Sequence, residues 1–268
     1  MLGGPDEFKI AVIGGTGFEQ FPFKIRHDPL VVKTPFGDIP LEHGAYQGTQ
    51  IYFLLRHGKD HVAPHEVNYR ANAVALYKLG VSAILSSAAV GSLSSSLKPG
   101  DFVLIDDFID MTRGRPQTVL TVPKKTKSHR AAALHVSMSE PYCSVIGGEL
   151  LAAAKAQSVD VKKGGVYVAV EGPRFESRAE IRAYRTLGGD VVGMTNVPEV
   201  VFARELGICY AALGLVTNMA AGLSPSAPSP AEVVSMMDAK SETIRAVFRA
   251  AADRLIQNPQ TILTHKHS

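Results

Sequence analysis

Arg56 and His57 stand side by side at the end of a short apolar run, and together they are suited to bind an oxyanion. The guanidinium carries a fixed charge with a fork of N–H donors, and the imidazole can donate one more hydrogen bond. An arginine that pairs with a structural carboxylate would give the same pattern, since a buried arginine needs a counter-anion. We expect the nearby His61 and His65 to be satisfied surface histidines.

A second candidate for anion binding is the run Gly14-Gly15-Thr16-Gly17, which also follows an apolar run. Glycines let backbone N–H groups approach a phosphate, and the threonine adds a hydroxyl. Taken alone, the motif fits a plain glycine turn equally well. No amphipathic helix follows, because the next segment is interrupted at Pro22, and the Gly-Lys-Ser/Thr ending of a nucleoside triphosphate loop is absent. A dinucleotide or triphosphate site of either standard type is therefore disfavoured.

The elements that would position these residues are short runs rich in Val, Ile and Leu that alternate with helical patterns. Such runs are typical of strands buried on both faces of an α/β sheet. We expect strands at residues 9–14, 51–55, 83–85, 102–105, 166–170, 191–194 and 209–216. Helices are expected at 64–77, 144–156, 177–186, 198–206 and 230–257, with irregular segments at 111–142 and 224–230.

Polar or glycine-rich sequences follow six of the predicted strands. Beyond the two motifs above, they are the small-residue run 86–92, Glu171-Gly172, Thr195-Asn196 and Thr217-Asn218. Ligands of open α/β sheets bind beyond the carboxyl ends of the strands. If the strands are neighbours and mostly parallel, these residues therefore form one site.

Length and composition favour one soluble domain over residues 1–268, with flexible tails at 1–8 and 259–268. No apolar run approaches the ~20 residues of a membrane helix, and no secretory signal precedes the first strand, so we expect a cytoplasmic protein without membrane contact. The net charge is only +3, and Lys124, Lys125, Lys127 and Arg130 are expected to lie in a solvated loop. A nucleic-acid partner is not expected.

The two cysteines, Cys143 and Cys209, are far apart and lack ligand-like spacing to histidine. We therefore expect two reduced thiols, with neither a disulfide framework nor a metal site.

Several motifs in order along residues 9–257 resemble the purine nucleoside phosphorylase and methylthioadenosine phosphorylase family. They are IGGTG, RHG with VNYRAN, the glycine and PGD motifs around Gly91 and Pro99, IDDFID with RPQ, MSEPYC, EGPRFES, GMTNVPE and VTN. EGPRFES with GMTNVPE is highly specific. The resemblance implies a single α/β domain with a central, distorted mixed β-sheet flanked by helices, a homotrimer, and inorganic phosphate as co-substrate with no other cofactor.

The resemblance also assigns roles to individual residues. It places on phosphate the residues Thr16, Arg56, His57, Ala89 through its backbone, and Thr195. Phe175 would lie against the base, Met194 beneath the ribose, and His135 in the neighbouring subunit's site. Many family members carry a hydroxyl or amide residue where this chain has Ala88, so one contact to phosphate or ribose would be missing. Glu171 is the residue that methylthioadenosine phosphorylases carry.

Two positions decide the purine preference. Asn218 stands where the methylthioadenosine branch has an aspartate, and the next family aspartate is replaced by Ala220. An amide donates to the oxygen at position 6 and accepts the hydrogen on nitrogen 7. Glu176 stands where that branch has serine and 6-oxopurine phosphorylases have glutamate, which accepts from protonated nitrogen 1. A helix-start carboxylate would explain Glu176 alone, but it would not explain Asn218.

These residues predict an enzyme, a purine nucleoside phosphorylase (a pentosyltransferase) that cleaves inosine and guanosine reversibly with phosphate. Asn218 would stabilise the leaving base, and His57 would act on phosphate. Near the sugar 5-position, Pro230 stands where 6-oxopurine phosphorylases have histidine and the methylthio branch an apolar residue. S-methyl-5'-thioinosine and S-methyl-5'-thioadenosine therefore stay as alternatives, and a non-catalytic nucleotide-binding module is a more remote one.

Overall fold

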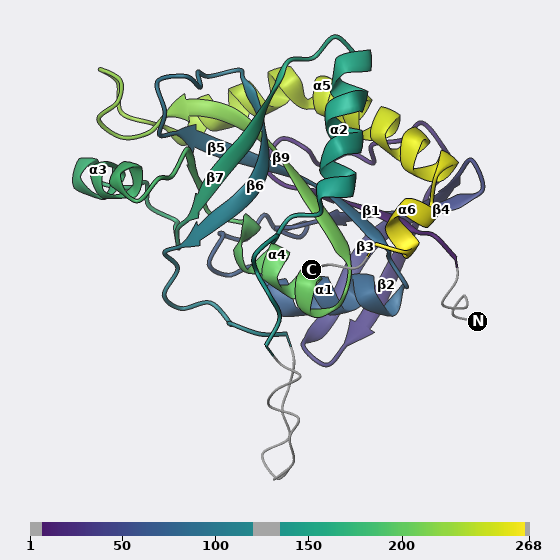
Figure 1. The fold of residues 1–268 in the computed structure, drawn as a ribbon. Helices are drawn as coiled ribbons and strands as arrows, with labels where there is room; N and C mark the ends of the chain where they lie inside the picture. The colour runs from purple at the N-terminus through teal and green to yellow at the C-terminus, as the bar shows by residue number, and fades with distance from the viewer. Residues whose placement is uncertain (1–6, 120–134, 266–268) are drawn as a thin grey trace.

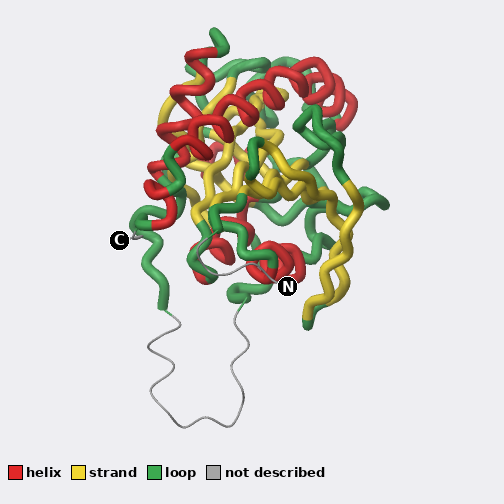
Figure 2. The backbone as a smooth tube through the Cα atoms, turned by 90° about the vertical axis from the view of Figure 1, so that its right-hand side faces the viewer, coloured by secondary structure: helices red, strands yellow, loops and turns green. Residues whose placement is uncertain are grey.

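The computed structural model describes residues 7–119 and 135–265, which form a nine-stranded mixed sheet with helices on both faces (Figures 1 and 2). The strands are β1 Ile10–Gly14, β2 Asp28–Thr34, β3 Gly37–Tyr46, β4 Thr49–Leu55, β5 Ala83–Ser92, β6 Phe102–Asp110, β7 Val161–Ala169, β8 Val191–Gly193 and β9 Cys209–Met219. The helices are α1 Tyr69–Lys78, α2 Ser144–Ala156, α3 Arg178–Thr186, α4 Asn196–Glu205, α5 Pro230–Gln257 and α6 Gln260–Leu263.

Alternation along the central strands divides the core into two layers. Ile10 and Val12 of β1 pack in the layer that contains α2 and α5. Ala11 and Ile13 point to the other face and pack with α1 and α4. Both faces of β1 are buried, which explains why its sequence is apolar without interruption.

The sheet follows the order β2-β3-β4-β1-β5-β8-β7-β6-β9, and β5 also pairs with β9. Strands β5 to β9 therefore close into a ring, which curves this half of the sheet. The pairs β1–β4, β1–β5 and β5–β9 are parallel, whereas β5–β8 and β6–β9 are antiparallel. The α/β class and the mixed, distorted sheet are confirmed, and the assumption of mostly parallel neighbours holds for the central strands.

The β2–β3 hairpin is the main element that the sequence pattern did not predict. In its strands exposed residues are interspersed with buried or half-buried ones, so they lack the continuous apolar run of the central strands. Helix α1 begins at Tyr69 instead of residue 64, because Asn68 caps it by accepting from the Ala71 N–H at 3.2 Å. Helix α4 begins two residues earlier than expected, with a cis Val197–Pro198 bond in its first turn.

The prediction of flexible tails does not hold for the described parts of both ends. Phe8 is buried, and α6 packs Ile262 into the core beside α2 and α5. Residues 1–6, 266–268 and the basic run 124–130 lie outside the described part of the chain. The described portions of the segment 111–142 contain neither helix nor strand, since β6 ends at Asp110 and α2 begins at Ser144.

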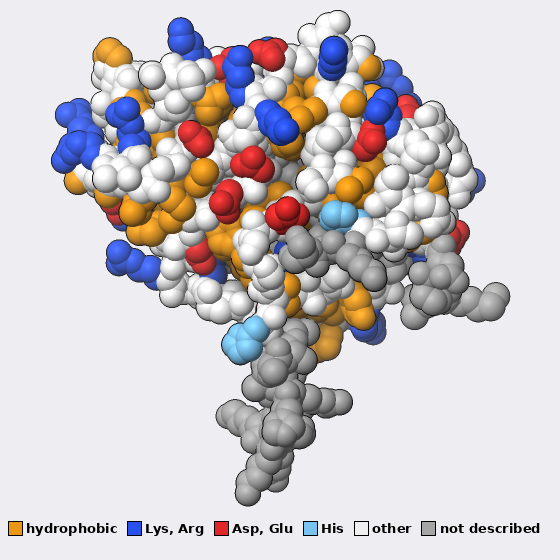
Figure 3. All heavy atoms as spheres, viewed as in Figure 1, with side chains coloured by type: hydrophobic (Ala, Val, Ile, Leu, Met, Phe, Trp, Pro, Cys, Tyr) orange, Lys and Arg blue, Asp and Glu red, His pale blue; other side chains and the backbone are white. Residues whose placement is uncertain are grey.

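Two features of the described chain are the character of its helices and the distribution of charged side chains on its surface. None of the described helices combines the length and the apolar character that a bilayer crossing requires. On the face drawn in Figure 3, several acidic side chains lie near the middle and most basic side chains lie around them.

Candidate active site

A cavity of about 430 Å³ lies at the carboxyl ends of β1, β4, β5, β8 and β9, beside the start of α5. Ten of the residues predicted to bind phosphate or nucleoside line it: Thr16, Arg56, His57, Ala89, Phe175, Glu176, Met194, Thr195, Asn218 and Pro230. His135 is exposed and does not line the cavity of its own chain. The strand ends thus bring together residues from the whole length of the sequence.

The glycine turn after β1 lies directly against the Arg56 guanidinium. Phe18 N–H donates to the Gly15 carbonyl at 3.0 Å, which closes the turn, and Gly17 has φ of +70°. A Cβ on Gly15 would lie 2.6 Å from the nearest guanidinium nitrogen of Arg56. Only glycine at position 15 leaves that edge of the guanidinium accessible from the turn.

Arg56 forms the ion pair that the sequence left open as an alternative. Its Nε and one terminal nitrogen donate to the two carboxylate oxygens of Glu199 at 3.0 and 2.9 Å. Further donations go to the Ser86 hydroxyl at 2.7 Å and the Ser87 carbonyl at 3.1 Å. Burial lowers the pKa of Arg56, but the Glu199 carboxylate outweighs this and raises it. Arg56 is therefore a fixed cation at the cavity wall, with one N–H on its Nη1 atom left for a ligand.

His57 is held in one tautomer by the backbone. Its Nδ1 lies 2.8 Å from the Val62 carbonyl, which can only accept, so Nδ1 carries the hydrogen. Burial and then the Arg56 charge lower the pKa of His57 to about 4. At neutral pH Nε2 is thus an acceptor, which corrects the expectation that this imidazole donates. It can take the hydrogen of a protonated phosphate oxygen.

His61 is exposed, as the sequence pattern indicated, and it also lines the cavity. Its ring stacks on His57 with centroids 5.2 Å apart, and its Nε2 lies 3.4 Å from the Thr16 hydroxyl. Its Nδ1 faces the Glu19 carboxylate at 3.5 Å. The short spacing between His57 and His61 in the sequence could have indicated that both line the cavity. The Val62 N–H donates to the His57 carbonyl and folds this segment into a turn.

Glu176 lines the opposite end of the cavity as a buried carboxylate. Burial raises its pKa. The adjacent Arg174 pairs with Glu180 instead, at 2.7 and 2.9 Å, and Glu180 also forms a capping box with Ser177 at the start of α3. Within the described chain no cation lies in ion-pair range of Glu176. The helix-start role therefore belongs to Ser177 and Glu180, and Glu176 is left for a ligand.

Asn218 ends the buried part of β9 and is oriented by its neighbours. Its amide nitrogen donates to the Met219 carbonyl at 3.0 Å, and its oxygen accepts from the Thr217 hydroxyl at 2.8 Å. One N–H and one lone pair remain. Since Gly91 faces Asn218 without a side chain, the amide is accessible from the cavity at the point where the β5–β9 register shifts.

The wall formed by the start of α5 is apolar. Pro230 occupies the first helical position, and Ser229 and Glu232 form a capping box that fixes this end of the helix. Val233, Val234 and Met237 follow along the same wall. This surface suits a hydrocarbon or thioether group better than a hydroxyl.

Two strand-end residues that the sequence placed at the site serve the framework instead. Glu171 accepts from the Arg113 and Gly114 N–H groups at 2.6 and 2.8 Å and pairs with Arg115 at 3.3 Å. Arg115 in turn donates to the Val197 carbonyl. The side chain of Ala88 packs in the core beneath the sheet, so no polar contact is missing from the cavity at that position.

Arg115 was not predicted as a functional residue, although it lies in the RPQ motif. It ties the segment after β6 to the ends of β7 and α4, and its guanidinium lies 5.1 Å from the ring centre of Tyr69. It therefore supports the cavity without lining it.

Comparison with known proteins supports the inferred resemblance. Residues 9–253 match the family model described as the Phosphorylase superfamily. The chain is 46% identical over 244 residues to a 6-oxopurine nucleoside phosphorylase from Pyrococcus furiosus, covering 91% of each chain. It is 45% identical over 233 residues to a probable S-methyl-5'-thioinosine phosphorylase from Methanopyrus kandleri, covering 86% of each.

Among solved structures, methylthioadenosine phosphorylase from Schistosoma mansoni in complex with adenine superposes with a TM-score of 0.87 at 34% identity. The match covers 96% of this chain and 96% of that one. The fold is therefore the one that the motifs indicated.

The ion pair at the cavity wall gives a prediction about stability. Glu199→Gln should lower the free energy of unfolding by about 3–5 kcal/mol, because Arg56 would stay buried without a counter-charge. Urea denaturation would measure it. Glu242→Gln is the matched control, since Glu242 also accepts from two arginines, at 2.9 and 2.6 Å, but its side chain is 63% exposed. The control should change stability by less than about 1 kcal/mol, and equal losses would contradict the account.

Proposed function

This chain belongs to the Phosphorylase superfamily, and we propose that it is a purine nucleoside phosphorylase that acts on 6-oxopurine nucleosides. It would cleave inosine and guanosine reversibly to the free base and ribose 1-phosphate. The observation that carries the proposal is that two groups of residues line one cavity. Arg56, His57 and the glycine turn are suited to bind an anion, and Glu176 with Asn218 would bind the purine.

Phosphate would bind between Thr16, Arg56 and Thr195. The Thr195 hydroxyl caps no helix N–H, while its backbone N–H donates to the Tyr167 hydroxyl at 2.9 Å, which fixes the residue. The free Nη1 hydrogen of Arg56 supplies charge, and neutral His57 accepts from a protonated phosphate oxygen. A dianion held in this way lies next to the anomeric carbon and stabilises positive charge on the sugar.

The reaction then exchanges one bond at the anomeric carbon for another. The bond to purine nitrogen 9 breaks with its electron pair going to the base, and a phosphate oxygen bonds to the same carbon. Nitrogen 7 takes up a proton, which balances the proton that hydrogen phosphate gives up as it becomes ribose 1-phosphate. The Asn218 carbonyl would accept that N–H while the amide donates to the oxygen at position 6. We propose that preorganised donors carry the rate effect with phosphate as co-substrate and without a metal or organic cofactor.

Glu176 supports the choice of a 6-oxopurine. A buried carboxylate accepts from the N–H at position 1 of hypoxanthine or guanine, whereas adenine offers a lone pair there and would be repelled. Phe175 would pack against the base and Met194 beneath the ribose. Both polar groups of the purine end favour the same class of base, which argues against S-methyl-5'-thioadenosine as the main substrate.

The apolar wall of α5 supports a second candidate, S-methyl-5'-thioinosine. Pro230, Val233 and Met237 present no polar side chain where a 5-hydroxyl would lie. A methylthio group would bury apolar surface there, at about 0.8 kcal/mol for each buried carbon group. The related protein from Methanopyrus kandleri carries that probable activity in its name.

We also propose a homotrimer in the cytoplasm, with neither nucleic acid nor membrane as a partner. His135 is exposed outside its own cavity, so a role at the site would have to be in a neighbouring subunit. A non-catalytic nucleotide-binding module would also need an anion site beside a purine site. We favour the enzyme because the named relatives are phosphorylases, and the phosphate-dependence assay separates the two.

Phosphate dependence tests the proposed reaction directly. Purified protein should release hypoxanthine from inosine and guanine from guanosine only when phosphate is present, and ribose 1-phosphate should appear in equal amount. Chromatography of both products measures this, with S-methyl-5'-thioinosine and S-methyl-5'-thioadenosine assayed beside them. Base release at the same rate without phosphate would exclude phosphorolysis, and cleavage of S-methyl-5'-thioadenosine alone would exclude the 6-oxopurine assignment.

Asn218→Asp should shift preference towards 6-aminopurine nucleosides. A protonated aspartate donates to nitrogen 7 and accepts from the 6-amino group, whereas a carboxyl lacks the amide donor for a 6-oxygen. The ratio of kcat/KM for adenosine to that for inosine should rise about tenfold or more, equivalent to about 1.4 kcal/mol. Thr217→Val removes only the neighbouring hydroxyl and serves as the control, with loss of rate but no change in the ratio. An unchanged ratio in Asn218→Asp would contradict the purine site.

Glu176 predicts an acidic limit to activity. Burial raises its pKa above the ordinary 4.5, so on acidification it takes up a proton at a higher pH than an exposed glutamate does. As the pH is lowered, activity on inosine should therefore begin to fall while the pH is still above 4.5, because the protonated Glu176 no longer accepts a hydrogen bond. His57, with a pKa of about 4, would titrate later. In Glu176→Gln the kcat/KM profile should lack this limb, and an identical profile in both proteins would show that another group sets it.

A further inference from the structure

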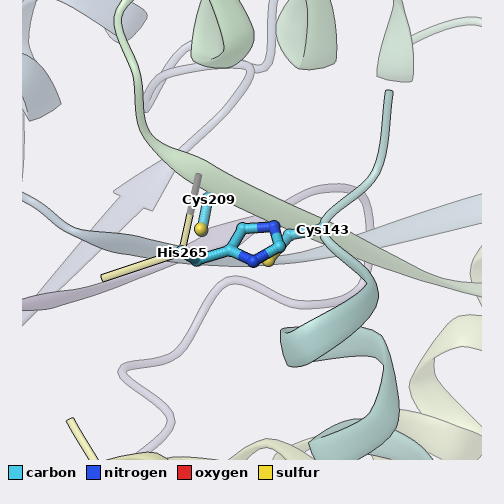
Figure 4. Close-up of side chains that lie close together, drawn as sticks. All are labelled: Cys143, Cys209 and His265. Carbon is cyan, nitrogen blue, oxygen red and sulfur yellow. The ribbon is translucent and has the colours of Figure 1, made fainter. Parts of the chain in front are cut away.

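Cys143, Cys209 and His265 lie side by side near the amino end of β9, away from the cavity (Figure 4). A sulfur from each cysteine and a ring nitrogen of the histidine all lie within 4.8 Å of one another. Both cysteines are buried, and His265 is half-buried. Both cysteines are free thiols, as expected, but the fold brings them together although they are remote in the sequence.

Backbone contacts place each of the three residues. Cys143 is the N-cap of α2, and its N–H donates to the Tyr210 carbonyl at 2.8 Å. Cys209 opens β9, and its N–H donates to the Ser82 carbonyl at 3.1 Å. His265 follows α6, whose Ile262 is anchored in the core. Three separate segments thus converge on one point before any ligand is considered.

The two thiols lie close enough to share a hydrogen bond. A metal ion binds the thiolate form of cysteine and can replace the proton that neighbouring thiols share.

We propose that Cys143, Cys209 and His265 form a binding site for a soft divalent cation of the Zn²⁺ class. Two thiolates and an imidazole are the donors that Zn²⁺ takes from proteins. With metal–sulfur and metal–nitrogen distances of about 2.3 and 2.0 Å, tetrahedral ligand atoms lie roughly 3.3–3.8 Å apart. The ligand atoms, all within 4.8 Å of one another, would move into that range by side-chain rotation as the ion binds. Two thiolates neutralise the cation, so its burial leaves no net charge, and the fourth position is left to water.

The ion would tie the segment after α5 to α2 and β9. Cys209 starts the strand that ends near Asn218, and no residue of the cluster lines the cavity. We therefore expect the ion to stabilise the fold and to leave the phosphorolysis assay unchanged.

Titration with Co²⁺ tests the site in the full-length, untagged protein after reduction and removal of metal with a chelator. One equivalent should bind with the thiolate charge-transfer absorption and the visible bands of tetrahedral cobalt, and Zn²⁺ should displace it. Cys143→Ser and Cys209→Ser should each remove most of the charge-transfer absorption, and His265→Ala should weaken Co²⁺ binding at least tenfold. His27→Ala, which removes an exposed histidine far from the cluster in sequence, should bind as the wild type does.

A stability measurement keeps the proposal open to refutation if a cysteine variant fails to fold. Saturating Zn²⁺ should raise the Tm of the wild type and of His27→Ala by several degrees, and should raise that of His265→Ala less. Absence of thiolate absorption in the reduced wild type, or the same absorption in every variant, would overturn the proposal. So would loss of both free thiols in air to a disulfide without any metal uptake by the reduced protein.

Discussion

The buried ion pair between Arg56 and Glu199 is the interaction on which the arrangement of the cavity depends. Glu199 accepts from Arg56, the Ser86 hydroxyl at 3.0 Å and the Tyr210 hydroxyl at 2.6 Å, so one carboxylate joins β4, β5, α4 and β9. Arg56 is also held by its backbone, since its N–H donates to the Gly14 carbonyl at 2.9 Å. A guanidinium buried for ligand binding must have a counter-charge when no ligand is bound, and Glu199 supplies it from behind the wall.

This constraint explains the division of labour in the cavity. Most N–H donors of Arg56 are bonded to the protein, so its guanidinium has a fixed position. An anion can therefore bind it only beside Gly15, where one N–H remains free. The opposite end has the reverse character, because Glu176 keeps a charge that no described cation compensates. A ligand that is anionic at one end and offers N–H donors at the other satisfies both. Phosphate with a 6-oxopurine nucleoside is such a pair.

The central strands and most helices could be predicted from the sequence, because continuous apolar runs report burial on both faces. The β2–β3 hairpin was not predicted, since its few buried residues are separated by exposed ones and form no continuous apolar run. Arg56 and Asn218 follow strands, which drew attention to them, whereas Phe175, Met194 and Pro230 were assigned by the family resemblance. Arg115 acts from an irregular segment and His61 from a tight turn. The donor role of His57 depended on which nitrogen the Val62 carbonyl engages, and only three-dimensional structure reveals that.

Strand β9 connects the proposed metal site at Cys209 with the proposed purine site at Asn218. From Cys209 to Asn218 it runs roughly 30 Å at about 3.3 Å per residue, buried throughout and paired with β5 along its length. A rigid strand of this kind fixes Asn218 in the purine site only if its start is fixed as well. Cross-linking at Cys209 would therefore reduce fraying of β9 and of the segment that follows α5. Such a cross-link acts on the lifetime of the folded site and leaves the chemistry to the cavity.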